Sequence, residues 1–175
     1  VMSAPSEIYH NLEDADLREA DFSRANVSWF QFNGADMSDA ILRNAVFEYT
    51  NMEGVNLAGA DLTGANMGGI DLRKANLTGA TMDKAFLNKT VMSDATVSGA
   101  SVQSLRSRNS NVRRVDFGQA YGTGSMFFEN TKTKGSTLPR GFVNHYRDNS
   151  LIAQGDGWKL NYRLGALTYV LTFDW

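Results

Sequence analysis

The residues of this chain that could perform acid–base chemistry are its aspartates, and they recur at a fixed spacing. Two carboxylates held close together can act as a general acid and a general base, but a catalytic pair is not expected to repeat along a chain. Asp and Asn side chains also form turns, because they accept hydrogen bonds from the backbone two residues further on. We therefore interpret one series as outward, turn-forming residues: Asp16, Asp21, Asn26, Asp36, Asn51, Asn56, Asp61, Asn66, Asp71 and Asn76.

Other chemistry-bearing residues are few. His10 and His145 have no partners at metal-ligand spacing, and both are expected to be surface or cap residues. The chain has no cysteine, which excludes disulfides and thiol chemistry and leaves the cellular compartment open. The segment Gly122–Gly124 lacks the third glycine of a dinucleotide site. We therefore predict a protein that is not an enzyme and that binds no cofactor and no metal.

The elements that position these residues follow from a period of five. Every fifth residue from Leu12 to Phe127 is apolar except Ser107 and Gly122, and we interpret the register as unbroken over this range. Two positions earlier stands a column of mostly alanine, so the unit is A-(D/N)-L-x-x, as in residues 60–64. A period of five fits neither a helix nor a strand. It predicts a solenoid, in which the chain turns a corner once per repeat and each repeat buries its apolar residue against its neighbours.

These columns resemble the pentapeptide-repeat family over roughly two-thirds of the chain. The resemblance implies an all-β fold, a right-handed quadrilateral β-helix with four pentapeptides per coil. At the strand spacing of about 4.8 Å, the repeats would build about six coils. The central residue and the small residue two before it would point inward. Several repeats end in a glycine, as a turn with a positive φ requires: Gly54, Gly59, Gly64, Gly69, Gly79 and Gly99.

We expect three regions: an N-terminal extension or cap (1–11), the β-helix (12–129), and a loop with an aromatic-rich C-terminal segment (130–175). Residues 130–141 are polar and predict a loop. The remainder predicts a β-hairpin with its turn near Gly155–Gly157. Its apolar stretch is too short to span a bilayer as a helix, so membrane insertion is not expected. The segment would either cap the solenoid or mediate assembly, such as a homodimer, through Trp158, Tyr162, Tyr169, Phe173 and Trp175.

Large apolar residues also occupy outward positions of the expected coil. With twenty residues per coil, Trp29, Tyr49, Gly69 and Lys89 stack on one face, while Phe30 takes a position meant for alanine, so that the coil must widen or expel the ring. One interpretation is local packing under the N-terminal extension, and the other is a patch that binds a protein partner. The candidate partner-binding residues are Trp29, Tyr49, Val46, Phe86 and Ile41.

The charge of the chain is unevenly distributed. The formal net charge is −2, but residues 1–105 hold fourteen acidic and seven basic side chains, whereas residues 106–175 hold five and ten. Four arginines lie at the junction of the two parts. Because these arginines are not interleaved with aromatic residues, we expect a solvated basic surface rather than a nucleic-acid site. They are Arg106, Arg108, Arg113 and Arg114.

Two functions are consistent with these observations. The first is a non-catalytic protein-interaction or structural module, which acts alone or as a subunit of a larger assembly. The second is implied by the resemblance, because quinolone-resistance members of the family bind and protect DNA gyrase by imitating DNA. Duplex DNA carries a negative charge about every 1.7 Å, and the acidic surface here is sparse by comparison. The sequence leaves the location of a soluble protein open, between the cytoplasm and, if Val1 ahead of Met2 marks a processed start, an organelle or the thylakoid lumen.

Overall fold

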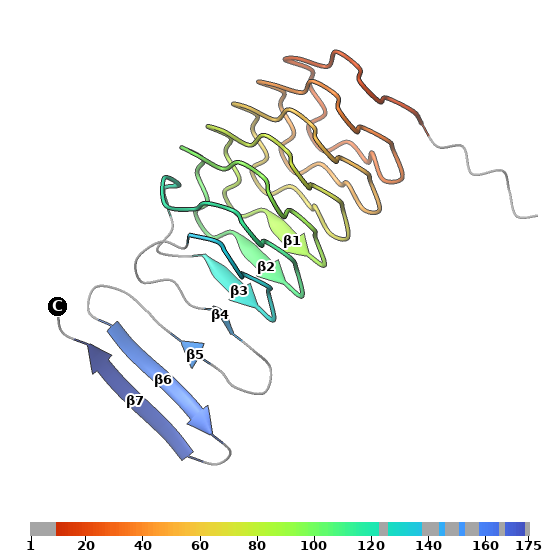
Figure 1. Cartoon of the computed structure of the whole chain (residues 1–175). Coiled ribbons are helices and arrows are strands. Elements are labelled where there is room, and N and C mark those ends of the chain that lie inside the picture. Colours follow the sequence, from red (N-terminus) through yellow and green to blue (C-terminus); the bar gives the residue numbers. More distant parts are fainter. Residues whose placement is uncertain are drawn as a thin grey trace, which may run out of the picture.

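The chain folds into a column of stacked, four-sided coils, followed by a small sheet (Figure 1). The structure is a computed structural model. It describes residues 10–122 and 126–137 in full, and the backbone of the strands at 144–145, 151–152, 158–164 and 167–173. No helix occurs among these residues, and the prediction of an all-β repeat fold is confirmed.

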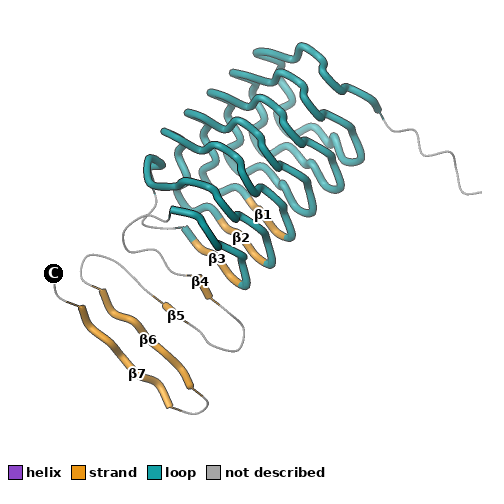
Figure 2. The backbone as a smooth tube through the Cα atoms, in the orientation of Figure 1, coloured by secondary structure: helices purple, strands orange, loops and turns teal. Residues whose placement is uncertain are grey.

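Adjacent coils are joined by parallel bridges between residues twenty apart, from Asn11 with Gln31 to Ser101 with Tyr121. The N–H of Leu12 donates to the carbonyl of Gln31 (2.8 Å), and the N–H of Gln31 donates to the carbonyl of His10 (3.0 Å). Most repeats pair at one residue only, so the column is drawn mainly as loop (Figure 2). Extended strands occur on one side, where β1 (Phe86–Asn88), β2 (Arg106–Arg108), β3 (Phe127–Glu129) and β4 (Asn144–His145) form a parallel sheet.

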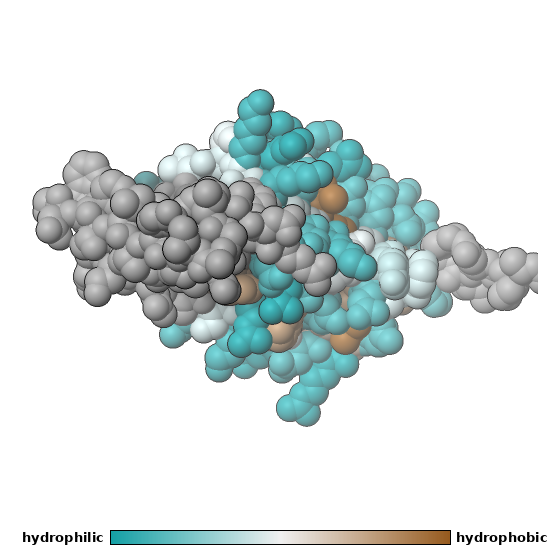
Figure 3. Space-filling view, turned by 90° about the horizontal axis from the view of Figure 1, so that it is seen from below, coloured by the Kyte–Doolittle hydropathy of each residue, from teal (hydrophilic) through white to brown (hydrophobic). Residues whose placement is uncertain are grey.

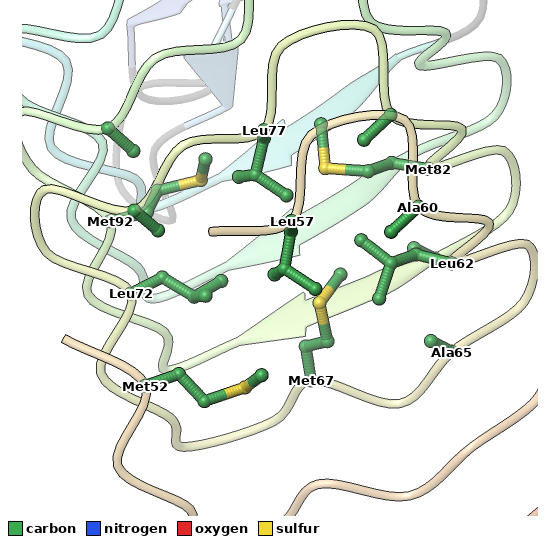
Figure 4. Packing of buried hydrophobic residues seen from close by; sticks show 14 of the residues in the cluster. Met52, Leu57, Ala60, Leu62, Ala65, Met67, Leu72, Leu77, Met82 and Met92 are labelled. Carbon is green, nitrogen blue, oxygen red and sulfur yellow. The ribbon is translucent and has the colours of Figure 1, made fainter. Parts of the chain in front are cut away.

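The interior of the column is filled by the central residue and the small residue of each repeat. Leu57, Leu62 and Met67 point into one lumen, with Ala60 and Ala65 beside them (Figure 4). All five are fully buried. Alanine leaves room for one large side chain per wall, because protein interiors are packed to nearly uniform density. The inward orientation of both columns is confirmed.

Serine and threonine replace alanine at some of these inward positions. The hydroxyl of Thr50 donates to the carbonyl of Val27 (3.1 Å), and that of Thr90 donates to the carbonyl of Met67 (2.5 Å). Both residues are buried, so these bonds supply the partner that a buried hydroxyl needs.

Leu105 and Ser107 reverse the usual order of small and large side chains within a repeat. Leu105 occupies a small-residue position and Ser107 a central position, and both are fully buried. The larger side chain at one position compensates for the smaller one at the other, so the filling of this wall is preserved. The hydroxyl of Ser107 lies 3.3 Å from that of Thr131, in the next coil.

The prediction of an unbroken register to Phe127 is wrong. β1 aligns Leu87 with Ser107, twenty residues apart, but β2 aligns Ser107 with Phe128, twenty-one apart. Phe128 is therefore the buried residue, while Phe127 is only half-buried. One additional residue lies between Tyr121 and β3, and it shifts every column that follows.

Gly122, which the sequence places in the central column, is exposed instead. Its φ of 71° lies in the left-handed region. A Cβ at this position would lie 3.1 Å from both the backbone nitrogen and the Cβ of Gln103 in the preceding coil. Glycine is thus required here by conformation and by close approach.

The prediction of a loop over residues 130–141 is also wrong for its first part. Lys132 bridges to Asn111 and Thr137 bridges to Asp116, again twenty-one residues apart. Thr131 is fully buried. The coiled path therefore continues past residue 129 to Thr137, and residues 138–141 lie outside the described part.

The C-terminal segment contains an antiparallel sheet of three strands. β5 (Leu151–Ile152) pairs with β6 (Trp158–Leu164), which pairs with β7 (Leu167–Phe173). The turn predicted near residues 155–157 falls between β5 and β6 and lies outside the described residues, and the pairing of β6 with β7 was not predicted. The register aligns Trp158 with Phe173 and Tyr162 with Tyr169. The side chains of these candidate assembly residues, and Trp175 altogether, also lie outside the described part.

The first coil closes the column only partly. Leu12, Leu17 and Phe22 are half-buried, whereas their counterparts one coil later are fully buried. The predicted N-terminal extension lies outside the described residues up to residue 9. Phe30 is half-buried at this end, where its ring stacks on Phe32 at 5.6 Å and lies 4.4 Å from the ring of His10.

Candidate interaction face

One side of the column carries four of the five residues that the sequence nominates for partner binding. We call it the aromatic face. Its backbone is positioned by bridges from Asn26 to Val46, Asn66 and Phe86, and then by the β1–β2–β3 pairing. Coil stacking thus brings together residues that lie twenty positions apart in the sequence. The face comprises residues 26–29, 46–49, 66–69, 86–89, 106–109 and 127–130.

Trp29 and Tyr49 form a stacked pair at one corner of this face. Their ring centroids are 4.5 Å apart, with an interplanar angle of 20°. The pair is open to solvent, because 52% of Trp29 and 60% of Tyr49 is exposed. Figure 3 shows that hydrophobic residues reach the surface of the column as separate patches among hydrophilic ones.

The backbone at both aromatic residues is strained. Their φ values are 70° for Trp29 and 58° for Tyr49. Most repeats have a positive φ at this corner, whether the residue is glycine (Gly59), asparagine (Asn44) or a long side chain (Lys84). A residue other than glycine costs about 1–2 kcal/mol in this conformation, so this cost belongs to the turn of the repeat and is shared by many corners.

At the other end of the face, aromatic residues and arginines alternate. The guanidinium of Arg106 lies 5.7 Å from the ring centre of Phe86, and that of Arg108 lies 5.7 Å from the ring centre of Phe127. Arg108 also pairs with Glu129 at 2.9 Å. The interpretation that the arginines have no aromatic residues among them is therefore wrong for Arg106 and Arg108. Both distances lie within the range of cation–π interactions.

The remaining candidates are less closely grouped. Val46 is half-buried in the first column of the aromatic face, and Phe86, in the same column, is 37% exposed. Ile41 is 39% exposed but lies one repeat earlier in its coil, on the adjoining side of the column. Tyr121, which is 58% exposed, was missed. It follows Ile41 by a multiple of twenty residues, so the repeat spacing was sufficient to predict that both lie on the same side of the column.

Beyond the aromatic face, many surface carboxylates are paired with arginine. Arg18 binds Asp16 at 2.7 Å, and Arg43 binds Asp61 at 2.5 Å. Arg73 contacts both Asp71 and Glu53, and Arg114 makes two hydrogen bonds of 2.6 Å to Asp94. The turn-forming role of the Asp and Asn column is seen at Asn11, whose side chain accepts a bond from the N–H of Glu13 (2.9 Å).

Hydrogen bonding in these turns lowers the pKa of several aspartates. The side chain and then the backbone of Arg18 lower the pKa of Asp16 from 3.8 to about 2. The side chain and backbone of Ser38 likewise lower the pKa of Asp36. A carboxylate with a lowered pKa in the folded state stabilises the fold above its unfolded pKa.

We therefore predict that stability falls with pH between about 4 and about 2, as these carboxylates take up protons. The urea midpoint followed by circular dichroism should decrease over this range. The double variant Asp16→Asn/Asp36→Asn keeps an acceptor for each turn but cannot titrate there, so its midpoint should decrease less steeply. Equal slopes for the two proteins would contradict the prediction.

The repeat columns and the bridges define a family. A profile of pentapeptide repeats matches the chain in eight copies, over residues 11–39, 40–79 and 70–103, which is more than half of its length. The chain belongs to the pentapeptide-repeat family. A comparison with curated protein sequences gave no match.

Solved structures similar to this pentapeptide-repeat protein include one from the thylakoid lumen of Arabidopsis thaliana. It is 23% identical, with 62% of this chain and 65% of that chain covered and a TM-score of 0.41, so this chain spans less than two-thirds of its length. QnrB1, a plasmid-mediated fluoroquinolone resistance protein, is 17% identical, with 75% and 83% covered and a TM-score of 0.42. HetL from the cyanobacterium Nostoc is 15% identical, with 79% and 89% covered and a TM-score of 0.27.

Within the described residues of this pentapeptide-repeat protein, no three His, Asp or Glu side chains gather as metal ligands would. The same residues contain no helix with the length and apolarity needed to cross a membrane.

Proposed function

We propose that this protein is a non-catalytic interaction module, a rigid β-helix that presents its aromatic face to a protein partner. In this proposal the column is a right-handed coil of about six turns, and the C-terminal sheet caps it or joins two copies. The observation that carries the proposal is the Trp29–Tyr49 pair, whose two rings are stacked while more than half of each residue is exposed.

The corner position itself does not require an aromatic residue, because Gly69 and Lys89 occupy it in the following coils. Glycine or asparagine would occupy these corners at lower conformational cost. Exposed stacking of two rings contributes about 0.5–1.5 kcal/mol, which at best offsets the cost of the backbone. Tryptophan and tyrosine are also the residues most enriched at the energetic centres of protein interfaces.

DNA mimicry of the gyrase-binding kind is less well supported. A mimic needs a dense surface of free negative charge. Here Arg18, Arg43 and Arg73 neutralise carboxylates of the acidic part of the column at distances of 2.5–2.9 Å. The arginines at the C-terminal end of the aromatic face oppose the required sign.

The proposal is tested with the double variant Trp29→Asn/Tyr49→Asn. Asparagine tolerates the positive φ of both corners, so we expect a melting temperature close to that of the wild type. Affinity capture from the native source, followed by mass spectrometry and repetition with purified protein, should identify a partner that the double variant fails to bind.

The matched control is Arg24→Asn/Lys84→Asn. Both of these residues have a φ of 60° at an equivalent corner on another side of the column. This control should retain the partner. If the Trp29/Tyr49 variant fails to fold, the aromatic pair is packing rather than an interface. If it folds and still binds every captured partner, the proposed face is wrong.

A further inference from the structure

In the column of corner residues on the aromatic face, Gly69 carries no side chain, and neither does Gly68 beside it. The corner column runs from Trp29 and Tyr49 through Gly69 to Lys89. Tyr49 has one ring face against Trp29, and its Cδ1 and Cε1 lie 3.9 Å from where a Cβ of Gly69 would stand. The ring of Tyr49 therefore lies between Trp29 and Gly69, the corner of the next coil that carries no side chain.

The size of this gap fits one aromatic ring. Tyr49 and Lys89 are two coils apart, a separation of about 9–10 Å at the usual strand spacing. A ring inserted between them would lie about 4.5–5 Å from Tyr49, which is the distance of an offset-stacked pair and close to the 4.5 Å of the Trp29–Tyr49 pair. The ammonium of Lys89 would then lie on its opposite side, where a cation is attracted to a ring.

The charges on the two sides of the gap are opposite in sign. Glu48 lies on the Tyr49 side, where its carboxylate accepts a bond from the amide of Asn66 (3.0 Å). On the other side lie Lys89 and Arg106, and neither has an ion-pair partner among the described residues. Arg108, beside them, is paired with Glu129. Negative charge on a ligand is thus favoured on one side of the gap only.

We propose that the gap between Tyr49 and Lys89 binds an aromatic side chain of a protein partner, in a segment that also carries acidic residues and places them toward Lys89 and Arg106. The inference rests on the proposed function and specifies the partner's chemistry. The ring completes the stack, and the carboxylates pair with Lys89 and Arg106, which have no ion-pair partner among the residues that the structure describes.

The test uses the full chain and a fluorescein-labelled peptide, Gly-Ser-Trp-Asp-Glu-Asp-Gly, followed by fluorescence anisotropy up to about 1 mM. We expect saturable binding to the wild type, and binding weakened about fivefold or more when the peptide's tryptophan is replaced by leucine or its acids by serine. Salt should weaken binding.

Two variants test the site itself. Gly69→Asn fills the gap with a residue that tolerates its φ of 72°, and Lys89→Glu reverses the charge. Each should weaken binding about fivefold or more. Their controls lie on other sides of the column: Gly79→Asn, where a Cβ meets nothing within 4 Å, and Lys84→Glu, which has the φ of Lys89 within one degree. Both controls should bind like the wild type.

The remaining outcomes overturn the inference in different ways. Peptide binding that is unaffected by Gly69→Asn would place the site elsewhere. Absence of peptide binding, together with a captured partner that requires Trp29 and Tyr49, would refute the acidic aromatic ligand and leave the proposed function standing. Gly69-dependent binding of an oligothymidine single strand, without binding of the peptide, would assign the gap to a nucleobase instead of a protein side chain.

Discussion

Leu77→Asp should abolish cooperative folding of the column or destabilise it by about 4 kcal/mol or more. Leu77 is fully buried and points into the lumen. A carboxylate there would have only apolar neighbours and the backbone groups already used between coils, so its charge would be buried without a partner. Thermal and urea unfolding followed by circular dichroism measure the loss.

The matched control is Thr78→Asp, one position further along the chain. Thr78 is exposed, and the hydrogen bonds given for it use its backbone: its N–H donates to Asn76 Oδ1 (3.1 Å), and its carbonyl accepts from the N–H of Gly59 (2.9 Å). We expect its unfolding free energy to stay within about 0.5 kcal/mol of the wild type. A similar loss of stability for both variants would mean that the inward and outward columns are assigned incorrectly.

The second large effect concerns the exchanged pair Leu105 and Ser107. Leu105→Ala alone should cost about 2–4 kcal/mol by leaving a cavity. Ser107→Leu alone should cost about 1–3 kcal/mol by over-packing the wall beside Leu105. The double variant restores the usual order of sizes, so its loss should be smaller than the sum of the two by about 1 kcal/mol or more.

A distant pair provides the reference for this cycle. Leu105→Ala combined with Phe32→Leu joins two fully buried residues near opposite ends of the column, and their effects should add within about 0.5 kcal/mol. Additive losses for the Leu105/Ser107 pair would show that the two side chains do not share one space. The restored pair also removes the contact of Ser107 with Thr131, so full recovery is not expected.

The columns could be predicted from the sequence because every pentapeptide meets the same physical requirement. It places one large and one small residue inside the column and forms a turn outside. It could not predict the register beyond Tyr121, since Met126, Phe127 and Phe128 form an apolar run that satisfies either alignment. The polar composition after Asn130 suggested a loop. Thr131 can nevertheless be buried, because its hydroxyl lies near carbonyls of Ser107 and Glu129.

For the candidate site, the spacing of twenty was sufficient to predict that Trp29 and Tyr49 adjoin. The same spacing is also sufficient to align Phe86 with Arg106 and Ile41 with Tyr121. The contact of Arg108 with Phe127 depends on the shift of one residue and required the structure. The positive φ at Trp29 and Tyr49, in contrast, could have been predicted, because both residues stand in the column of repeat-ending glycines.

The extra residue between Tyr121 and β3 also indicates where the chain tolerates growth. The described coils on both sides of it remain bridged, and the core continues at the fully buried Phe128. This corner therefore absorbs a change of length locally, whereas an insertion within a wall would turn every later side chain to the wrong side. A foreign epitope or a reporter domain inserted there would leave the preceding coils undisturbed. This position is therefore suited to engineered insertions.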